Sequence, residues 1–155
     1  MDLGSLPRLY GLDCSANRLS RLDLSGVPNL RKLACQVNTI AKLDLSNLPR
    51  LEELNCSANR LTRLDLAGVP SVRSLDCSAN SLKRLGLAGV PELRSLGCSG
   101  NGIGELDLSQ VPLLESLSCY SNRITALDLR PLRHLKELFF DAENTRLMQR
   151  PDQHF

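Results

Sequence analysis

The sequence predicts a solenoid, a stack of similar coils, and three regularities carry this prediction. The chain repeats itself every 21 residues, and each copy has a cysteine, an asparagine and a pair of leucines separated by a single residue at fixed positions. The cysteines are Cys14, Cys35, Cys56, Cys77, Cys98 and Cys119. The asparagines are Asn17, Asn38, Asn59, Asn80, Asn101 and Asn122. A fixed period of about twenty to fifty residues is the signature of a solenoid or repeat array.

The repeating unit reads L-x-x-L-x-C-x-x-N-x-L-x-x-L-D-L-x-x-V-P-x, and the third copy shows it in full. Leu54 and Cys56 are two residues apart, the side-chain period of a strand, so both point to one side. Leu64 and Leu66 repeat this spacing, with Asp65 facing outward between them. One coil cannot enclose its own apolar side, so we expect stacked coils with a parallel sheet along one side and short L-D-L strands along the other.

The repeated asparagine lies where the chain leaves the strand and turns. An inward carboxamide at this point can bond to backbone groups of the turn and of the neighbouring coil. Those groups would otherwise be buried unpaired, at a cost of about 1–3 kcal/mol each. We therefore expect a continuous column of asparagines.

The pattern resembles the leucine-rich repeat, L-x-x-L-x-L-x-x-N-x-L, with cysteine in the position of the third leucine. Its length, its cysteine and its L-D-L segment resemble most closely the bacterial internalin J type. The resemblance covers residues 9 to about 131 in six copies. It implies a right-handed solenoid, placed by convention in the α/β class although mostly strand and loop here, with the parallel sheet on the concave face. It says little about the ligand, because the repeated residues are the buried ones.

Composition and charge exclude several classes of function. Of 155 residues, 42% are hydrophobic and 23% charged, an ordinary balance for one domain. The net charge of +2 gives no electrostatic case for nucleic acid, and no apolar run is long enough to span a membrane. The start, MDLGSLPRLYGL, lacks the pattern of a secretory signal. We expect a cytoplasmic chain, or a secreted or host-delivered one if it is a fragment or an effector.

Six cysteines in a small chain can indicate disulfides, and neighbouring strands would bring adjacent Cα atoms within disulfide range. A reducing cytoplasm instead favours a column of free thiols. No C-x-x-C motif is present, and His134 and His154 lie outside the column, so we expect no metal and no cofactor. Inward thiols also lack the exposure and the base that a catalytic cysteine needs, so we expect no enzyme.

We divide the chain into a partial repeat (1–8), six full repeats (9–131), and a degenerate seventh repeat with a C-terminal cap (132–155). Met1–Pro7 aligns with residues 22–28, so the chain begins inside a coil with Met1 in a leucine position and no cap before it. Three readings stay open: a fragment, an edge covered by a partner or by edge-to-edge self-association, or a short chain that tolerates a bare edge.

The L-D-L segment is too short and extended for a helix, so the coils need not fan apart. We expect a nearly straight solenoid, with a turn of 3₁₀ helix at V-P-x-L. Outside the leucines, charges form two rows on this side, and Gly86 replaces the fourth aspartate. The basic row is Arg21, Lys42, Arg63 and Arg84, and the acidic row is Asp23, Asp44 and Asp65. We expect a solvated surface here rather than a docking strip.

The outward strand positions of repeats one to four are small or polar and predict a flat face with few anchors. Repeat five, LRSLGCSGNGIGELDL, is rich in glycine. It lacks the lysine and the strand–loop–helix setting of a phosphate loop. Its glycines reflect either drift at tolerant positions or a shallow dent near Gly97 and Ser99 where a partner backbone can approach.

Aromatic residues gather at the C-terminal end. Tyr120 and Phe139 fall at outward strand-face positions, whereas Phe140 takes the cysteine position of the seventh coil. Exposed aromatics are enriched in binding hot spots, and polar residues usually surround them. The candidate binding residues are Tyr120, Phe139, Ser118, Glu137, Asp141, Gly97 and Ser99. Residues 142–149 are expected to fold over the last coil as a cap, in one reading as a helix.

Two classes of function remain. The first is a non-catalytic module that binds a protein partner on the strand face, mainly at the C-terminal coils. The second is the recognition fragment of a larger bacterial effector or surface protein. By resemblance, such a protein can carry a separate ubiquitin-ligase domain, which is not among these residues. A purely structural segment is a third reading.

Overall fold

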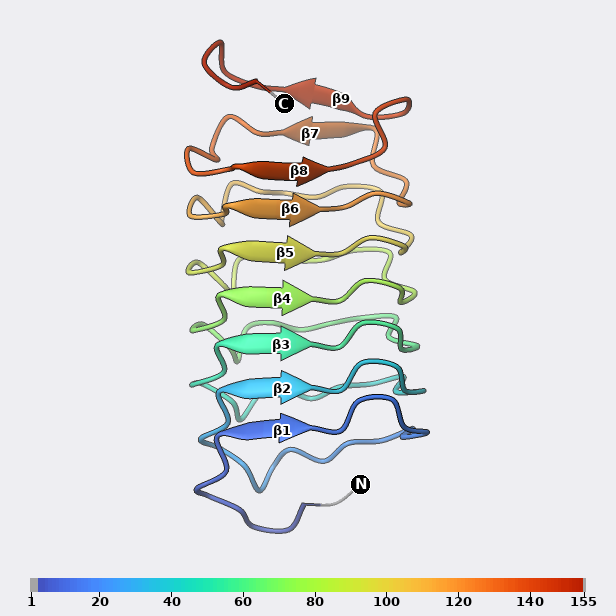
Figure 1. Ribbon diagram of the computed structural model, residues 1–155, viewed down its shortest axis with the longest axis vertical. Helices are drawn as coiled ribbons and strands as arrows, with labels where there is room; N and C mark the ends of the chain where they lie inside the picture. The colour runs from blue at the N-terminus through green and yellow to red at the C-terminus, as the bar shows by residue number, and fades with distance from the viewer. Residues whose placement is uncertain (1–2, 155) are drawn as a thin grey trace.

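The computed structural model describes residues 3–154, which form a single stack of coils in a nearly straight column (Figure 1). Each repeat contributes one three-residue strand to a seven-stranded sheet along one side of the stack. The strands are β1 (Gly11–Asp13), β2 (Lys32–Ala34), β3 (Glu53–Asn55), β4 (Ser74–Asp76), β5 (Ser95–Gly97), β6 (Ser116–Ser118) and β8 (Glu137–Phe139). Neighbours pair in parallel at an offset of one repeat, so Leu33 lies opposite Leu54 and Leu54 opposite Leu75. The predicted parallel solenoid of low curvature is confirmed.

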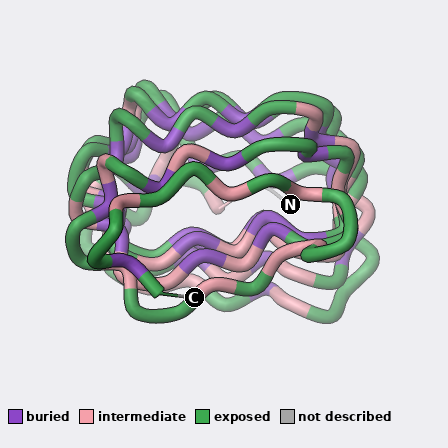
Figure 2. Tube along the Cα trace, turned by 90° about the horizontal axis from the view of Figure 1, so that it is seen from above, coloured by how far each residue is buried: buried purple, intermediate pink, exposed green. Residues whose placement is uncertain are grey.

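The hydrophobic core lies between the two long sides of each coil. Seen along the stack, each coil is a flattened ring with buried residues on both long sides (Figure 2). From the sheet side come residues such as Leu54, and from the opposite side Leu64 and Leu66, all under 9% exposed. Burying one leucine stabilises the fold by about 1.5–3 kcal/mol. Because each leucine packs on its equivalents in adjacent coils, no coil encloses a core of its own.

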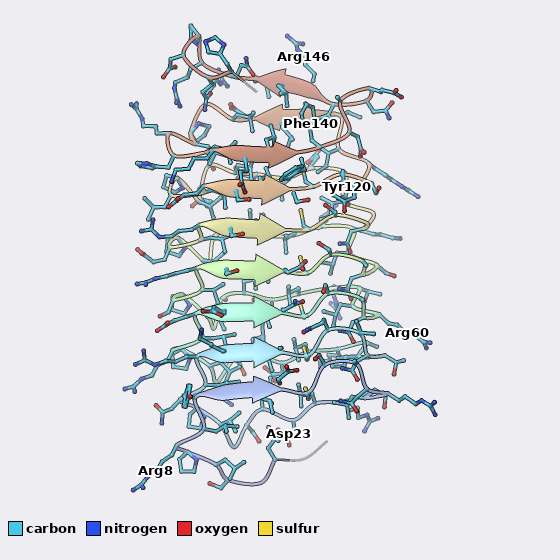
Figure 3. All side chains as sticks on the ribbon, in the orientation of Figure 1. Arg8, Asp23, Arg60, Tyr120, Phe140 and Arg146 are labelled. Carbon is cyan, nitrogen blue, oxygen red and sulfur yellow. The ribbon has the colours of Figure 1, made fainter. Side chains whose placement is uncertain are left out.

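The six cysteines are free and buried, as the sequence predicts. Their sulfurs follow one another up the stack just beyond the strand ends (Figure 3). Burial, assisted by the neighbouring Cys14 sulfur, raises the pKa of Cys35 from 9.0 to about 12. Burial also raises the pKa of Cys119 to about 12, with the Asp141 carboxylate adding to the effect. At neutral pH the column therefore consists of protonated thiols that act as small apolar side chains.

The asparagine column joins each coil to the one before it. The Asn59 Nδ2 group donates to the carbonyl oxygens of Cys35, Cys56 and Ser57 at 3.0, 3.2 and 3.1 Å. Its Oδ1 atom accepts the N–H of Ile40 at 3.0 Å. Four other asparagines each bridge the equivalent two carbonyls, that of the cysteine in their own coil and that of the cysteine in the coil before: Asn38, Asn80, Asn101 and Asn122. Each of these carboxamides thus hydrogen-bonds to backbone groups of its own turn and of the neighbouring coil.

The L-D-L side differs from the sheet side. Only the last segment forms a regular strand, β7 (Ala126–Asp128), which pairs in parallel with β9 (Arg146–Met148). In the earlier coils the segment is extended but is not a regular strand. Its aspartate bonds to the backbone two residues on, as Asp128 also does: Asp44 Oδ1 accepts the Ser46 N–H at 3.0 Å. Backbones approach closely here, since a Cβ on Gly89 would lie 2.5 Å from the Leu66 carbonyl oxygen.

The V-P-x-L stretch forms one tight turn, directly after another that ends at the same valine, and not the expected 3₁₀ helix. In the first repeat, the Val27 N–H donates to Leu24 O at 3.2 Å and the Leu30 N–H donates to Val27 O at 3.1 Å. Pro28 occupies the second position of the latter turn, where its fixed φ is favourable.

The helical reading of the C-terminal cap is wrong, because residues 146–148 form β9. Leu147 lies opposite Leu127, at an offset of 20 residues instead of 21, so the chain completes another coil. Gln153, which is 6% exposed, closes this end: its Nε2 group donates to the carbonyl oxygens of Leu129 and Leu132 at 3.0 and 2.9 Å. Phe140 is half-buried against the core, as expected. The prediction for Met1 lies outside the described residues.

We expect Asn59→Ala to lower the free energy of unfolding by at least about 1 kcal/mol more than Ser57→Ala does. The first change leaves the Ile40 N–H without an acceptor and removes one of the two asparagine donors from the carbonyls of Cys35 and Cys56. The Ser57 hydroxyl, by contrast, bonds only to the side chain of Asn55. Urea denaturation of the two variants measures this difference. Equal losses of stability would contradict the bridging role of the carboxamide.

We expect Val37→Gly to raise the free energy of unfolding by about 0.5–1 kcal/mol. Val37 is a β-branched residue in the left-handed region, at φ +56°, and its side chain is 55% exposed, so little packing is lost. Ala41, which is exposed and does not have positive φ, is the control. Ala41→Gly should destabilise the protein, and a loss of stability in both variants would refute backbone strain at Val37.

We expect stability to fall as pH rises above about 9. Unfolded thiols lose their protons near this pH, whereas Cys35 in the folded chain keeps its proton up to about 12, so unfolding releases protons in this interval. Each such thiol contributes a slope of about 1.4 kcal/mol per pH unit. Denaturation of wild type and Cys35→Ala from pH 8 to about 10.5 should show a shallower slope in the variant. Parallel slopes would exclude a proton-linked thiol.

Candidate functional site

The candidate site lies on the strand face, which we define as the outward side chains of the seven-stranded sheet together with the residue after each cysteine position. The pleat places these side chains outward because they alternate with the buried leucine and cysteine. Successive coils contribute equivalent positions, so the face consists of three columns running up the stack. Its character therefore depends on the residues that vary between repeats.

The N-terminal half of the strand face carries a shallow hollow of about 580 Å³ over β1 to β4. The sequence predicted a flat surface with few anchors here. The hollow forms where Gly11 and Ala34 are small beside longer side chains, and the Lys32 and Glu53 side chains cross it as an ion pair at 2.7 Å. Alternation of small and long residues between repeats is the sequence signal that would have indicated it.

The dent expected near Gly97 is occupied by the neighbouring coil. A Cβ placed on Gly97 would lie 2.9 Å from Asp76 Oδ1, so the Asp76 carboxylate covers this position. Ser99 is only 5% exposed, and its hydroxyl is 2.9 Å from that of Ser118. This differs from the expectation of a partner-facing Ser99, because its side chain bonds sideways to the next coil. Gly97 and Ser99 therefore support the surface rather than form it.

The C-terminal half exposes two aromatic side chains on successive coils. Tyr120 is 49% exposed and Phe139 is 58% exposed, and the Cys119 N–H donates to the Phe139 carbonyl oxygen at 2.8 Å, so the two segments are adjacent. The Tyr120 hydroxyl has no hydrogen-bond partner among residues 3–154. Together, Tyr120 and Phe139 form what we call the aromatic patch.

Polar groups beside the aromatic patch are held in place by neighbouring coils. Glu137 Oε2 accepts the Ser116 hydroxyl at 2.9 Å, and Asp141 Oδ2 accepts the Asn122 N–H at 3.3 Å. At the flank, Glu115 lies between Lys136 and Arg94, at 2.6 and 2.7 Å, and these hydrogen bonds lower its pKa. Exposed ion pairs add little stability, so their effect is to fix a charged border.

The structure thus gathers five of the predicted residues around the aromatic patch and places the other two, Gly97 and Ser99, in the preceding coil, beside Ser118. Tyr120, Phe139, Ser118, Glu137 and Asp141 come from β6, β8 and the residues that follow them. Polar groups around exposed aromatics are the arrangement that protein interfaces use.

The side chains of this surface can make apolar contacts and hydrogen bonds to another molecule. Within the described part of the chain, no three His, Cys, Asp or Glu side chains are placed to hold a metal ion. The thiols are buried, and burial raises the pKa of the Cys56 and Cys77 thiols well above 9.0. Residues 3–154 also contain no helix of the length and apolarity needed to cross a bilayer.

Comparisons with known proteins agree with this architecture. Residues 28–68 match the family model described as leucine-rich repeats in two copies, and no curated protein sequence matches the chain. The fold is similar to the functional domain of InlJ from Listeria monocytogenes, which includes a cysteine ladder. That match has a TM-score of 0.88 and 32% identity, over 91% of this chain and 32% of that one.

Two further solved structures are similar. A leucine-rich-repeat protein of Leptospira interrogans has a TM-score of 0.83 and 27% identity, over 91% of this chain and 38% of that one. YopM from Yersinia enterocolitica has a TM-score of 0.72 and 29% identity, over 92% of this chain and 33% of that one. This chain therefore spans between about a third and two fifths of the length of these three structures.

Proposed function

Since the chain is built of leucine-rich repeats with an internal cysteine ladder, we propose that it is a non-catalytic module that binds a protein partner on its strand face. Solenoids of this kind offer long, open surfaces, which suit contact with other proteins better than enclosure of a small substrate. The observation that carries the proposal is the aromatic patch at the C-terminal coils.

The aromatic patch has the features of a binding anchor. Two large rings on adjacent coils are about half exposed, although burying them inside the fold would be favourable. Tyr120 adds an unused hydroxyl that can bond to a partner while its ring is buried. The fixed carboxylates of Glu137 and Asp141 then form a polar rim, so the partner surface that fits carries an apolar centre with donor groups around it.

Tyr120→Ala combined with Phe139→Ala should weaken binding of a purified partner by at least about tenfold, because truncating a hot-spot aromatic costs about 2 kcal/mol or more. The rings are exposed, so the melting temperature should change little. Tyr10→Ala is the matched control, since Tyr10 is 68% exposed but lies in the first coil. Unchanged affinity in the folded double variant would remove the aromatic patch from the proposal.

A second candidate is that this module is the recognition part of a larger bacterial effector or surface protein. The partial coverage of InlJ and YopM favours it, since similar coils occur there within much longer chains. In that case the strand face selects the partner, and any enzymatic activity lies in a separate domain. The aromatic-patch variant distinguishes this candidate from a purely structural segment, for which loss of the rings would have no effect.

A further inference from the structure

A larger hollow lies on the side of the stack opposite the strand face. It has a volume of about 870 Å³ and crosses the L-D-L segments of three successive coils. We call it the basic groove, because four cations and one carboxylate line it: Lys42, Arg63, Lys83, Arg84 and Asp65. Leu64 and Leu66 lie beneath as part of the core, so the groove has an apolar floor and a charged edge.

The cations of the basic groove form no close pairs. In residues 3–154, none of the four takes part in an ion pair or a hydrogen bond, although Lys42 adds to the hydrogen bonds of Ser46 in lowering the pKa of Asp44. On the strand-face side, by contrast, Arg31, Arg94 and Lys136 each pair with a glutamate of the next or preceding coil. Equivalent residues on successive coils lie about 5 Å apart, so these like charges repel one another. An anion in the groove would relieve this repulsion.

Gly86 interrupts the acidic row inside this groove. In other coils the row aspartate accepts the backbone N–H two residues further on, as Asp65 does from Ala67 at 3.0 Å. The same bond recurs at Asp23, Asp44, Asp107 and Asp128, at 2.9 to 3.0 Å. At Gly86 no carboxylate is available, and the Ala88 N–H has no acceptor within the described chain. Both residues line the groove, on the same segment as Arg84.

We propose that the basic groove binds an acidic, extended segment of a partner protein, and that one carboxylate of this segment replaces the aspartate missing at Gly86. This carboxylate accepts the Ala88 N–H and neutralises Arg84, while further acidic side chains face Lys42, Arg63 and Lys83. The position is open, since a Cβ on Gly86 would meet no atom within 4 Å. The fold therefore supplies a carboxylate site of known geometry, occupied internally in the coils on either side.

Size and charge select a peptide among possible anions. The hollow is much larger than a single carboxylate or phosphate requires. Three coils span about 10 Å, which an extended segment of three to four residues matches at about 3.3 Å per residue. Asp65 and the nearby Asp44 interrupt the positive surface, which disfavours the continuous phosphate backbone of a nucleic acid. This site lies on the face opposite the aromatic patch, so it adds a second, independent binding surface to the proposed function.

Fluorescence anisotropy with a labelled peptide of alternating glutamate and aspartate tests the proposal, using the whole chain. We expect saturable binding to wild type, weakened as ionic strength rises, and none to the peptide of glutamine and asparagine. Gly86→Asp should reduce affinity at least about tenfold, because its own carboxylate takes the Ala88 N–H and offsets Arg84. Its melting temperature should be equal to or above that of wild type. Arg84→Ala should also weaken binding.

Gly11→Asp is the matched control, since its Cβ also meets open space but Gly11 lies in β1 on the opposite face and does not line the groove. Equal loss of affinity in both glycine variants, or no saturable binding to wild type, would overturn the proposal. Tighter binding of a single-stranded oligonucleotide of equal charge would replace it with general polyanion binding. The folded Tyr120→Ala, Phe139→Ala variant should bind the acidic peptide like wild type, so failure of either surface can be told from failure of the other.

Discussion

The bridge that each asparagine makes between two coils is the constraint on which the rest of the structure depends. Asn59 holds the carbonyl oxygens of Cys35 and Cys56 at 3.0 and 3.2 Å, and these belong to successive coils. Because a carboxamide reaches both only when they stand in register, the bridge fixes the offset at one repeat. Leucines and cysteines can then stack as columns, and the short strands of three residues become a continuous sheet.

This register divides the residues into inward ones, which stabilise the fold, and outward ones, which are available for binding. Inward positions are repeated because each must fit its equivalents above and below, and a change there leaves a cavity or an unpaired polar group. Outward positions meet only solvent and their neighbours in the column, so they vary from coil to coil. The aromatic patch, the hollow over β1 to β4 and the basic groove all arise from such variation. The surfaces that we propose for binding therefore lie where the repeat is least regular.

The absence of helices from the described residues also shapes the two faces. A coil with extended segments on both long sides is as wide on one side as on the other, which keeps the stack straight and leaves both sides open. The strand face is polar with aromatic anchors, whereas the opposite side concentrates unpaired cations near Gly86. The two surfaces that we propose for binding therefore differ in chemistry and lie on opposite sides of the stack.

The sequence alone determined the solenoid, the buried column of cysteines, the column of asparagines, and the exposure of Tyr120 and Phe139, because these follow from spacing within one period. Tertiary structure decided what depends on residues a whole coil apart. Asp76 covers Gly97, and the Ser99 hydroxyl bonds sideways to that of Ser118. Gln153 donates to the carbonyl oxygens of Leu129 and Leu132. In each case, stacking brings together groups from different coils that are about 20 residues apart in the sequence. The strand at 146–148 pairs with β7 at an offset of 20 residues, one fewer than the repeat length. The 21-residue period of the sequence therefore could not predict it.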